Sequence, residues 1–156
     1  MTSRRVTVLV ADDHPFIRAG VRALISAQRG IHLVGEAADG VDALRLVETL
    51  HPDVVVLDLV MPRLSGLDTL RDLFARGRHV NTVLLTATVD SHDVLEALQL
   101  GVRGVVLKDA VADELIRAIK TIVNGQYWLG GTSVTNLVPV LRRLRSEEHT
   151  SELQSR

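Results

Sequence analysis

The sequence predicts an α/β protein built on a doubly wound parallel sheet with helices on both faces. Short, valine-rich apolar runs alternate with amphipathic helical patterns over about the first 125 residues, giving five strand–helix units. Apolar runs of this kind, bounded by polar residues, are typical of strands that are buried on both faces of a parallel sheet. The predicted strands span residues 6–11, 31–36, 54–57, 82–85 and 105–107.

The helices of these units are marked by residues that begin or end a helix. Pro15 fits the first turn of the first helix, and Asp39 and Ser91 are expected N-caps of the second and fourth helices. The third helix is expected over 67–74. Gly125 ends the last helix, whose apolar residues recur at spacings of three and four.

Composition excludes several classes of protein. The chain of 156 residues is long enough for one domain with a real core, and its net charge of −1 gives no basic footprint for nucleic acid or an anionic membrane. The absence of cysteine excludes disulfides and thiolate metal sites and fits a cytoplasmic protein. No apolar stretch approaches the roughly 18 residues of a membrane helix, so no membrane association is expected.

Polar residues stand directly after four of the predicted strands. They are Asp12 and Asp13, Asp58, Thr86, and Lys108. Ligands of open α/β sheets bind outside the carboxyl ends of the strands, so we expect these five side chains to converge on one small polar site.

The expected site has the composition of a divalent-cation site. Carboxylates about 5 Å apart repel each other by roughly 3 kcal/mol per pair at an effective dielectric constant near 20, and only Lys108 offsets this repulsion. Hard oxygen ligands without His or Cys select Mg²⁺ or Mn²⁺ over Zn²⁺. The six histidines show no ligand spacing, and His14, which is next to the acids, is expected mainly to begin a helix.

The same residues favour phosphoryl chemistry. Asp58 stands alone at the end of the central strand, the position of a carboxylate nucleophile that forms an aspartyl phosphate. The cation and Lys108 would neutralise charge on the transferring group, and Thr86 would donate a hydrogen bond to it once it is present. Each residue alone has a plainer explanation as a helix cap, a turn residue, a strand residue or a solvated charge. The ordered set at four strand ends outweighs these explanations.

With these residues in this order, the chain resembles the receiver (CheY-like) domain of two-component response regulators, in particular the NarL/LuxR-type subfamily. The resemblance covers about residues 5 to 124. The motifs that carry it are Ala-Asp-Asp-His-Pro at 11–15, Leu-Asp-Leu-Val-Met-Pro at 57–62 with Gly66, Leu-Thr-Ala at 85–87, and Gly-Val-Val-Leu-Lys-Asp at 104–109.

The resemblance implies a flavodoxin/CheY-like sheet with strand order 2-1-3-4-5. It implies that Asp58 accepts phosphate from a sensor histidine kinase, and that Thr86 and Lys108 read the phosphoryl group. It implies an Mg²⁺ site formed by Asp12, Asp13, Asp58 and the backbone carbonyl of Val60. Such a receiver is a switch with self-catalysed phosphorylation and dephosphorylation, not a turnover enzyme. Its output surface would be the face formed by 94–107 and 113–123, which would control a transcriptional output domain absent from this chain.

Two positions depart from the family pattern. Val105 stands where the family usually has an aromatic residue that moves with the threonine, so a smaller or different rearrangement is expected. Asp109 follows the lysine where many receivers have a proline, often in a cis bond. Because a cis bond without proline costs roughly 3 kcal/mol, an altered loop or a strained peptide is expected there.

Three other functions remain as alternatives. A haloacid-dehalogenase-type phosphatase would need an acid two residues after its nucleophile, where this chain has Val60. A flavodoxin-like flavin binder would need a phosphate loop after the first strand, where Asp12 and Asp13 would repel the phosphate. A degenerate receiver that acts only as a docking module would have lost Asp58 or Lys108, and both are present.

The expected organisation is a receiver domain over 1–124, a linker and the start of a linker helix over 125–144, and a tail over 145–156. The tail resembles a translated sequencing adapter and is expected to be non-native or, alternatively, a natural disordered segment. DNA binding is expected only through a missing C-terminal helix-turn-helix domain. The apolar residues of the linker helix would then lack their normal partner, which allows homodimer formation. These residues are Leu137, Val140, Leu141 and Leu144.

Overall fold

A computed structural model of the chain describes residues 5–88, 92–134 and 141–142. It contains one sheet with strand order β2-β1-β3-β4-β5-β6-β7, in which the first five strands in the chain pair in parallel. This confirms the predicted class and the predicted order 2-1-3-4-5, and adds two short strands. The strands of the parallel core are β1 (Val6–Ala11), β2 (Ile31–Ala37), β3 (Val54–Asp58), β4 (Asn81–Thr86) and β5 (Gly104–Leu107).

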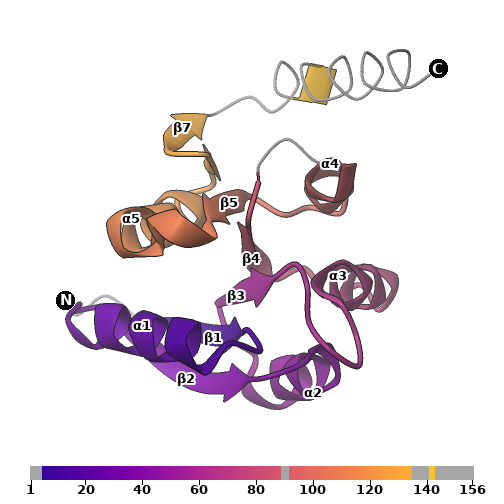
Figure 1. Cartoon of the computed structure of the whole chain (residues 1–156), viewed down its shortest axis with the longest axis horizontal. Coiled ribbons are helices and arrows are strands. Elements are labelled where there is room, and N and C mark those ends of the chain that lie inside the picture. The colour runs from indigo at the N-terminus through magenta and orange to yellow at the C-terminus, as the bar shows by residue number, and fades with distance from the viewer. Residues whose placement is uncertain (1–4, 89–91, 135–140, 143–156) are drawn as a thin grey trace.

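Five helices cover the two faces of the sheet (Figure 1). On one face lie α1 (Pro15–Ser26) and α5 (Val111–Val123). On the other lie α2 (Gly40–Leu50), α3 (Gly66–Ala75) and α4 (His92–Gln99). Because strands and helices alternate along the chain, crossover helices cover both faces of the sheet. Both faces of the strands are therefore buried, and their sequences are continuous apolar runs.

The sheet separates two apolar cores, because successive side chains of a strand point to opposite faces. Val8 and Val10 of β1 pack into the core under α1 and α5. Leu9 and Ala11 of the same strand pack into the core under α2, α3 and α4. All four side chains are fully buried, so β1 is a central strand that cannot shift its register without moving both cores.

Local capping chemistry accounts for the helix starts. Asp39 Oδ1 accepts a 2.8 Å hydrogen bond from the backbone N–H of Asp42, as the sequence predicted, and Pro15 occupies the first turn of α1. The predicted cap Ser91 lies outside the described residues. No helix within the described residues has the length and apolarity needed to cross a membrane.

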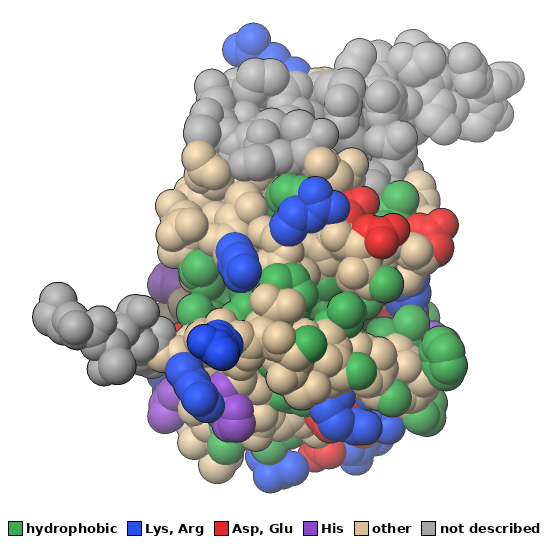
Figure 2. Space-filling model, turned by 90° about the vertical axis from the view of Figure 1, so that its left-hand side faces the viewer, with side chains coloured by type: hydrophobic (Ala, Val, Ile, Leu, Met, Phe, Trp, Pro, Cys, Tyr) green, Lys and Arg blue, Asp and Glu red, His purple; other side chains and the backbone are tan. Residues whose placement is uncertain are grey.

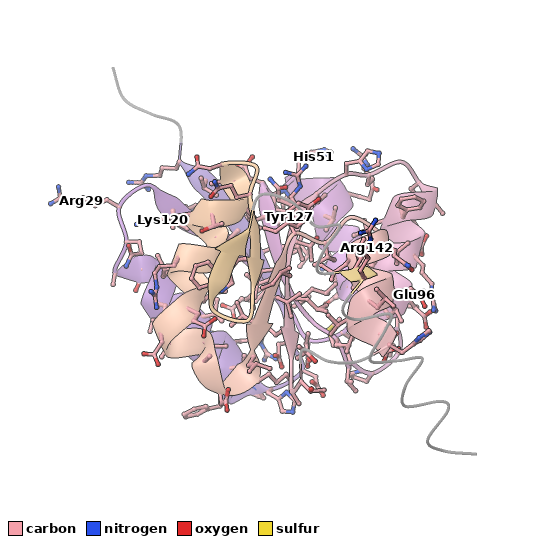
Figure 3. All side chains as sticks on the ribbon, turned by 90° about the horizontal axis from the view of Figure 1, so that it is seen from above. Arg29, His51, Glu96, Lys120, Tyr127 and Arg142 are labelled. Carbon is pink, nitrogen blue, oxygen red and sulfur yellow. The ribbon has the colours of Figure 1, made fainter. Side chains whose placement is uncertain are left out.

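The segment predicted as a linker adds β6 (Tyr127–Leu129) and β7 (Thr132–Val134) to the sheet. β6 pairs in parallel with β5, with Trp128 opposite Gly104, and β7 folds back on β6 in antiparallel fashion. Figure 3 shows this hairpin beside α5, with Tyr127 at its start. The tail over 145–156 and most of the predicted start of a linker helix lie outside the described residues, of which 141–142 are helical.

The Trp128 side chain fastens this hairpin to the domain. It is buried, and its Nε1–H donates a 3.0 Å hydrogen bond to Glu114 Oε1 on α5. The guanidinium carbon of Arg117 lies 5.6 Å from the centre of the indole ring, within the range of a cation–π contact. Trp128 is therefore part of the packed core of the domain, whereas the sequence analysis placed it in the linker over 125–144.

Candidate functional site

The structure brings four of the five predicted site residues together at the carboxyl edge of the sheet. Asp12 and Asp13 follow β1, Asp58 ends β3, and Lys108 follows β5. Lys108 Nζ lies 3.0 Å from Asp58 Oδ2 and 3.8 Å from Asp12 Oδ2. The three strands are adjacent or nearly adjacent in the sheet, so the ends of β1, β3 and β5 deliver three acids and one amine to one point.

A close turn holds Asp58 in place. The carboxylate Oδ1 accepts a 3.2 Å hydrogen bond from the backbone N–H of Val60, and the N–H of Gly66 donates a 2.9 Å hydrogen bond to the carbonyl of Leu59. A Cβ atom at position 66 would stand 2.1 Å from the carbonyl oxygen of Asp58. Only glycine lets α3 begin this close to the end of β3, and this contact sets the backbone of the acid.

The acids of the site are buried without full compensation. Asp12 is 0% exposed and Asp58 is 1% exposed. Within the described chain, Asp12 Oδ2 has no hydrogen-bond partner. Burial raises the pKa of Asp58 above its ordinary value, and the nearby Asp12 raises it further, while Lys108 and the N–H of Val60 act in the opposite direction. Negative charge is therefore in excess at the centre of the site.

His14 belongs to the site, whereas the sequence analysis placed it next to the acids but expected it mainly to begin a helix. It occupies the N-cap position of α1, as predicted, but its side chain makes no capping hydrogen bond. Instead, Nδ1 lies 2.8 Å from Asp12 Oδ1, 3.2 Å from Asp13 Oδ1 and 3.8 Å from Asp58 Oδ2. A histidine therefore stands beside the oxygen ligands, contrary to the expectation of a ligand set without His. Its contacts with Asp12 and Asp13 are local in the sequence, and only its approach to Asp58 could not be predicted from sequence spacing.

The donor set fits a divalent cation. Asp12, Asp13, His14 and Asp58 each offer one ligand atom, and these atoms lie within 4.8 Å of one another. Asp12 Oδ2 is fully buried and accepts no hydrogen bond from the described residues, although Lys108 Nζ lies 3.8 Å away. This oxygen is the observation that favours an ion, because a buried carboxylate oxygen without a hydrogen-bond donor is costly. The Val60 carbonyl as a fourth oxygen ligand stays a prediction.

Thr86 lies at the end of β4, where its hydroxyl bonds the loop that follows. Its hydroxyl donates a 3.0 Å hydrogen bond to the carbonyl of Thr88 and accepts a 3.4 Å hydrogen bond from the N–H of the same residue. The side chain is 4% exposed. The hydroxyl therefore stabilises the start of the β4–α4 loop in this state.

The structure shows what stands at Val105 and Asp109, the two positions that depart from the expected family pattern. Val105 is fully buried in the core under α2, α3 and α4, so no aromatic side chain stands there to swing inward. Lys108–Ala110 form a short 3₁₀ turn that leads directly into α5, and the described residues contain no cis peptide bond. The altered loop expected at Asp109 is thus a helical turn.

The chain is thus a doubly wound α/β protein with three acids and a lysine at the carboxyl edge of its sheet. The chain matches the family model of the response regulator receiver domain over residues 8–120. It is 37% identical over 147 residues to the nitrate/nitrite response regulator protein NarL of Escherichia coli K12, covering 94% of this chain and 66% of that protein. It is 32% identical over 153 residues to the uncharacterized transcriptional regulatory protein YxjL of Bacillus subtilis, covering 98% and 70%.

Solved structures give the same result. The receiver domain of the putative response regulator NarL from Mycobacterium tuberculosis is 34% identical, with a TM-score of 0.73 over 79% of this chain and 99% of that one. A LuxR-family response regulator from Aurantimonas is 30% identical, with a TM-score of 0.77 over 94% of this chain and 99% of that one.

The chain therefore belongs to the response regulator receiver domain family, and its receiver is of the NarL type. Receiver domains are generally signalling modules that interact with histidine kinases and bind Mg²⁺ at an acidic pocket. The chain spans about two thirds of the length of these curated relatives, 66% of NarL and 70% of YxjL.

Proposed function

We propose that Asp58 is the phosphoacceptor of this receiver and that a sensor histidine kinase is the donor. The observation that carries the proposal is a buried carboxylate at the end of the central strand with an ammonium group 3.0 Å away. The pairing places a positive charge where a transferring phosphoryl group would develop negative charge. Asp12, Asp13, Asp58 and the Val60 carbonyl would hold Mg²⁺ beside it.

The proposed step is an in-line displacement at phosphorus. A carboxylate oxygen of Asp58 forms the new O–P bond while the bond between phosphorus and the donor's histidine nitrogen breaks, and the electron pair leaves with that nitrogen. A bound Mg²⁺ would supply charge neutralisation of the phosphoryl oxygens. Lys108 supplies a second positive charge, and the Val60 N–H orients the nucleophile.

The proposal predicts a single site of modification. Incubation with acetyl phosphate and Mg²⁺ should add one phosphoryl group to the protein by intact mass, and Asp58→Asn should abolish the adduct. Asp72→Asn is the matched control, because Asp72 is an acid on α3 whose carboxylate pairs with Arg76 away from the site. An adduct that persists in Asp58→Asn would overturn the assignment.

We further propose that Thr86 couples phosphorylation to the surface formed by α4, β5 and α5. The hydroxyl now bonds the backbone of Thr88, and a phosphoryl oxygen on Asp58 would compete for its proton. Release of Thr88 would loosen the start of the β4–α4 loop, and a packed interface can amplify such a small change. With Val105 in the core in place of an aromatic side chain, the rearrangement should differ from that of receivers with the aromatic switch.

Thr86→Ala should therefore take up phosphate but lose most of the conformational response. We expect amide NMR shifts over 87–107 on addition of beryllofluoride to shrink several-fold in this variant. Thr82→Ala is the control, because Thr82 lies on the same strand, is equally buried and also donates to a backbone carbonyl, that of Val80. A full-sized response in Thr86→Ala would reject the coupling role.

We also propose that the output is transcriptional and acts in the cytoplasm through a DNA-binding domain outside these residues. Homodimer formation is proposed as well, and sedimentation would test it. The transcriptional output is supported by the relatives that are described as transcriptional regulators and extend beyond the matched region. Figure 2 shows separate Lys and Arg side chains among hydrophobic ones on the face it presents, not a continuous basic stripe. With 18 basic and 19 acidic residues, the chain lacks the charge that drives DNA affinity. A turnover phosphatase is not favoured, because Val60 stands where its acid would be needed.

A further inference from the structure

The imidazole of His14 stands among the acids of the proposed cation site. Nδ1 lies 2.8 Å from Asp12 Oδ1, 3.2 Å from Asp13 Oδ1 and 3.8 Å from Asp58 Oδ2. One nitrogen thus approaches three carboxylates at once, although an N–H can donate well to only one of them. Adjacent ligands in an octahedral shell with metal–ligand distances near 2.1 Å lie roughly 3 Å apart, so Nδ1 already has the spacing of a ligand toward Asp12 and Asp13.

The contacts of Nδ1 allow it two roles. With a proton, it donates to Asp12 Oδ1, which can also accept the 2.8 Å hydrogen bond from the backbone N–H of His14 because a carboxylate oxygen has two lone pairs. In the tautomer that is protonated on Nε2, Nδ1 has a lone pair within 3.8 Å of three carboxylates and 3.4 Å from Lys108 Nζ. A neutral imidazole with a free lone pair is the form that binds a metal ion.

A second observation points to a ligand at the same place. Asp12 is 0% exposed, and its Oδ2 atom has no hydrogen-bond partner in the described chain. The His14 side chain occupies the N-cap position of α1 without capping that helix, so helix capping does not explain why its ring lies among the acids.

We propose that Nδ1 of His14 is a direct ligand of the divalent cation and that the site therefore favours Mn²⁺ and Co²⁺ over Mg²⁺. The inference rests on the proposed function, because it assumes that Asp12, Asp13 and Asp58 hold the cation. Imidazole is a good ligand for first-row transition ions, whereas Mg²⁺ prefers oxygen and water. A nitrogen ligand shifts selectivity toward the transition ions without removing any carboxylate.

The direct test is pulsed EPR of the full chain loaded with Mn²⁺. Electron spin echo modulation from a coordinated imidazole ¹⁴N should appear in the wild type and disappear in His14→Ala. His14→Asn should also lack it, and this second variant keeps a residue suited to an N-cap, so α1 is retained. His32→Ala is the matched control, since His32 is exposed on β2 and should leave the modulation intact.

Calorimetric titrations with Mg²⁺, Mn²⁺ and Co²⁺ give the selectivity. In both His14 variants we expect the affinity for Mn²⁺ relative to Mg²⁺ to fall about tenfold, and more for Co²⁺. Mn²⁺ that binds without ¹⁴N modulation, or an unchanged selectivity ratio in both variants, would overturn the role of His14 and leave the proposed function in place. If no ion binds the wild type and Asp58 takes up no phosphate, the proposed function itself fails, and this inference fails with it.

Discussion

Gly66→Ala is expected to lower the free energy of unfolding by about 3 kcal/mol and to displace the proposed phosphoacceptor. A Cβ at this position would stand 2.1 Å from the Asp58 carbonyl oxygen, 2.9 Å from its carbonyl carbon and 2.9 Å from the Cα of Leu59. All three are backbone atoms, so relief of the clash requires α3 to move away from the end of β3. Uptake of phosphate from acetyl phosphate should fall together with the stability.

Chemical denaturation of the metal-free proteins measures this effect, and Gly20→Ala is the control. Gly20 lies within α1 and would meet no atom within 4 Å of an added Cβ. Because alanine favours a helix over glycine, this variant should gain about 0.5–1 kcal/mol. A Gly66→Ala protein as stable as the wild type would mean that the close approach of α3 to Asp58 is not required.

Asp58→Asn is expected to stabilise the metal-free protein by about 1 kcal/mol at pH 7, since the burial of the Asp58 carboxylate and its repulsion by Asp12 together outweigh its attraction to Lys108. Asp58 is 1% exposed, and burial and Asp12 both raise its pKa. An asparagine keeps the shape and can still accept from the N–H of Val60. Unfolding in the presence of EDTA measures the difference.

The stability difference between Asp58→Asn and the wild type should depend on pH. A carboxyl whose pKa in the folded state is raised above its unfolded value of about 3.8 destabilises the fold at pH above the folded pKa. That penalty disappears as the pH falls below the unfolded value. The advantage of Asp58→Asn should therefore shrink on acidification toward pH 4. A constant or growing advantage would contradict the raised pKa.

Saturating Mg²⁺ should reverse the order of the two proteins. A ligand at 100 times its Kd adds about 2.7 kcal/mol to the stability of the form that binds it. The wild type offers three acids to the ion and the variant only two. Equal stabilisation of both proteins by Mg²⁺ would place the ion elsewhere.

The sequence predicted the parts of the fold that depend on neighbouring residues. Valine-rich runs such as 54–57 are long enough to identify a buried strand, and Asp39 identified a helix start because its cap partner is three residues away. The convergence of Asp12, Asp58 and Lys108 followed from a general property of parallel sheets, and needed no knowledge of distances.

The features that the sequence analysis missed depend on distant partners. Residues 127–129 are too few to show a strand pattern. They form β6 by pairing with the edge of β5, and the Trp128 side chain hydrogen-bonds to Glu114 on α5. The contact of His14 with Asp58 was hidden for the same reason. The local position of this histidine accounts fully for a helix start, and only the folded chain brings Asp58 within 3.8 Å of its ring.

Trp128 is the chain's only tryptophan, which gives the buried β6 a spectroscopic use. Its indole is hydrogen-bonded to Glu114 and faces Arg117, both on α5, while its backbone pairs with β5. Excitation at the red edge of protein absorbance thus selects one fluorophore, positioned where the proposed output elements meet. Its emission maximum and its quenching by iodide report directly whether β6 stays seated on β5. Activation can therefore be followed in real time without attaching a dye.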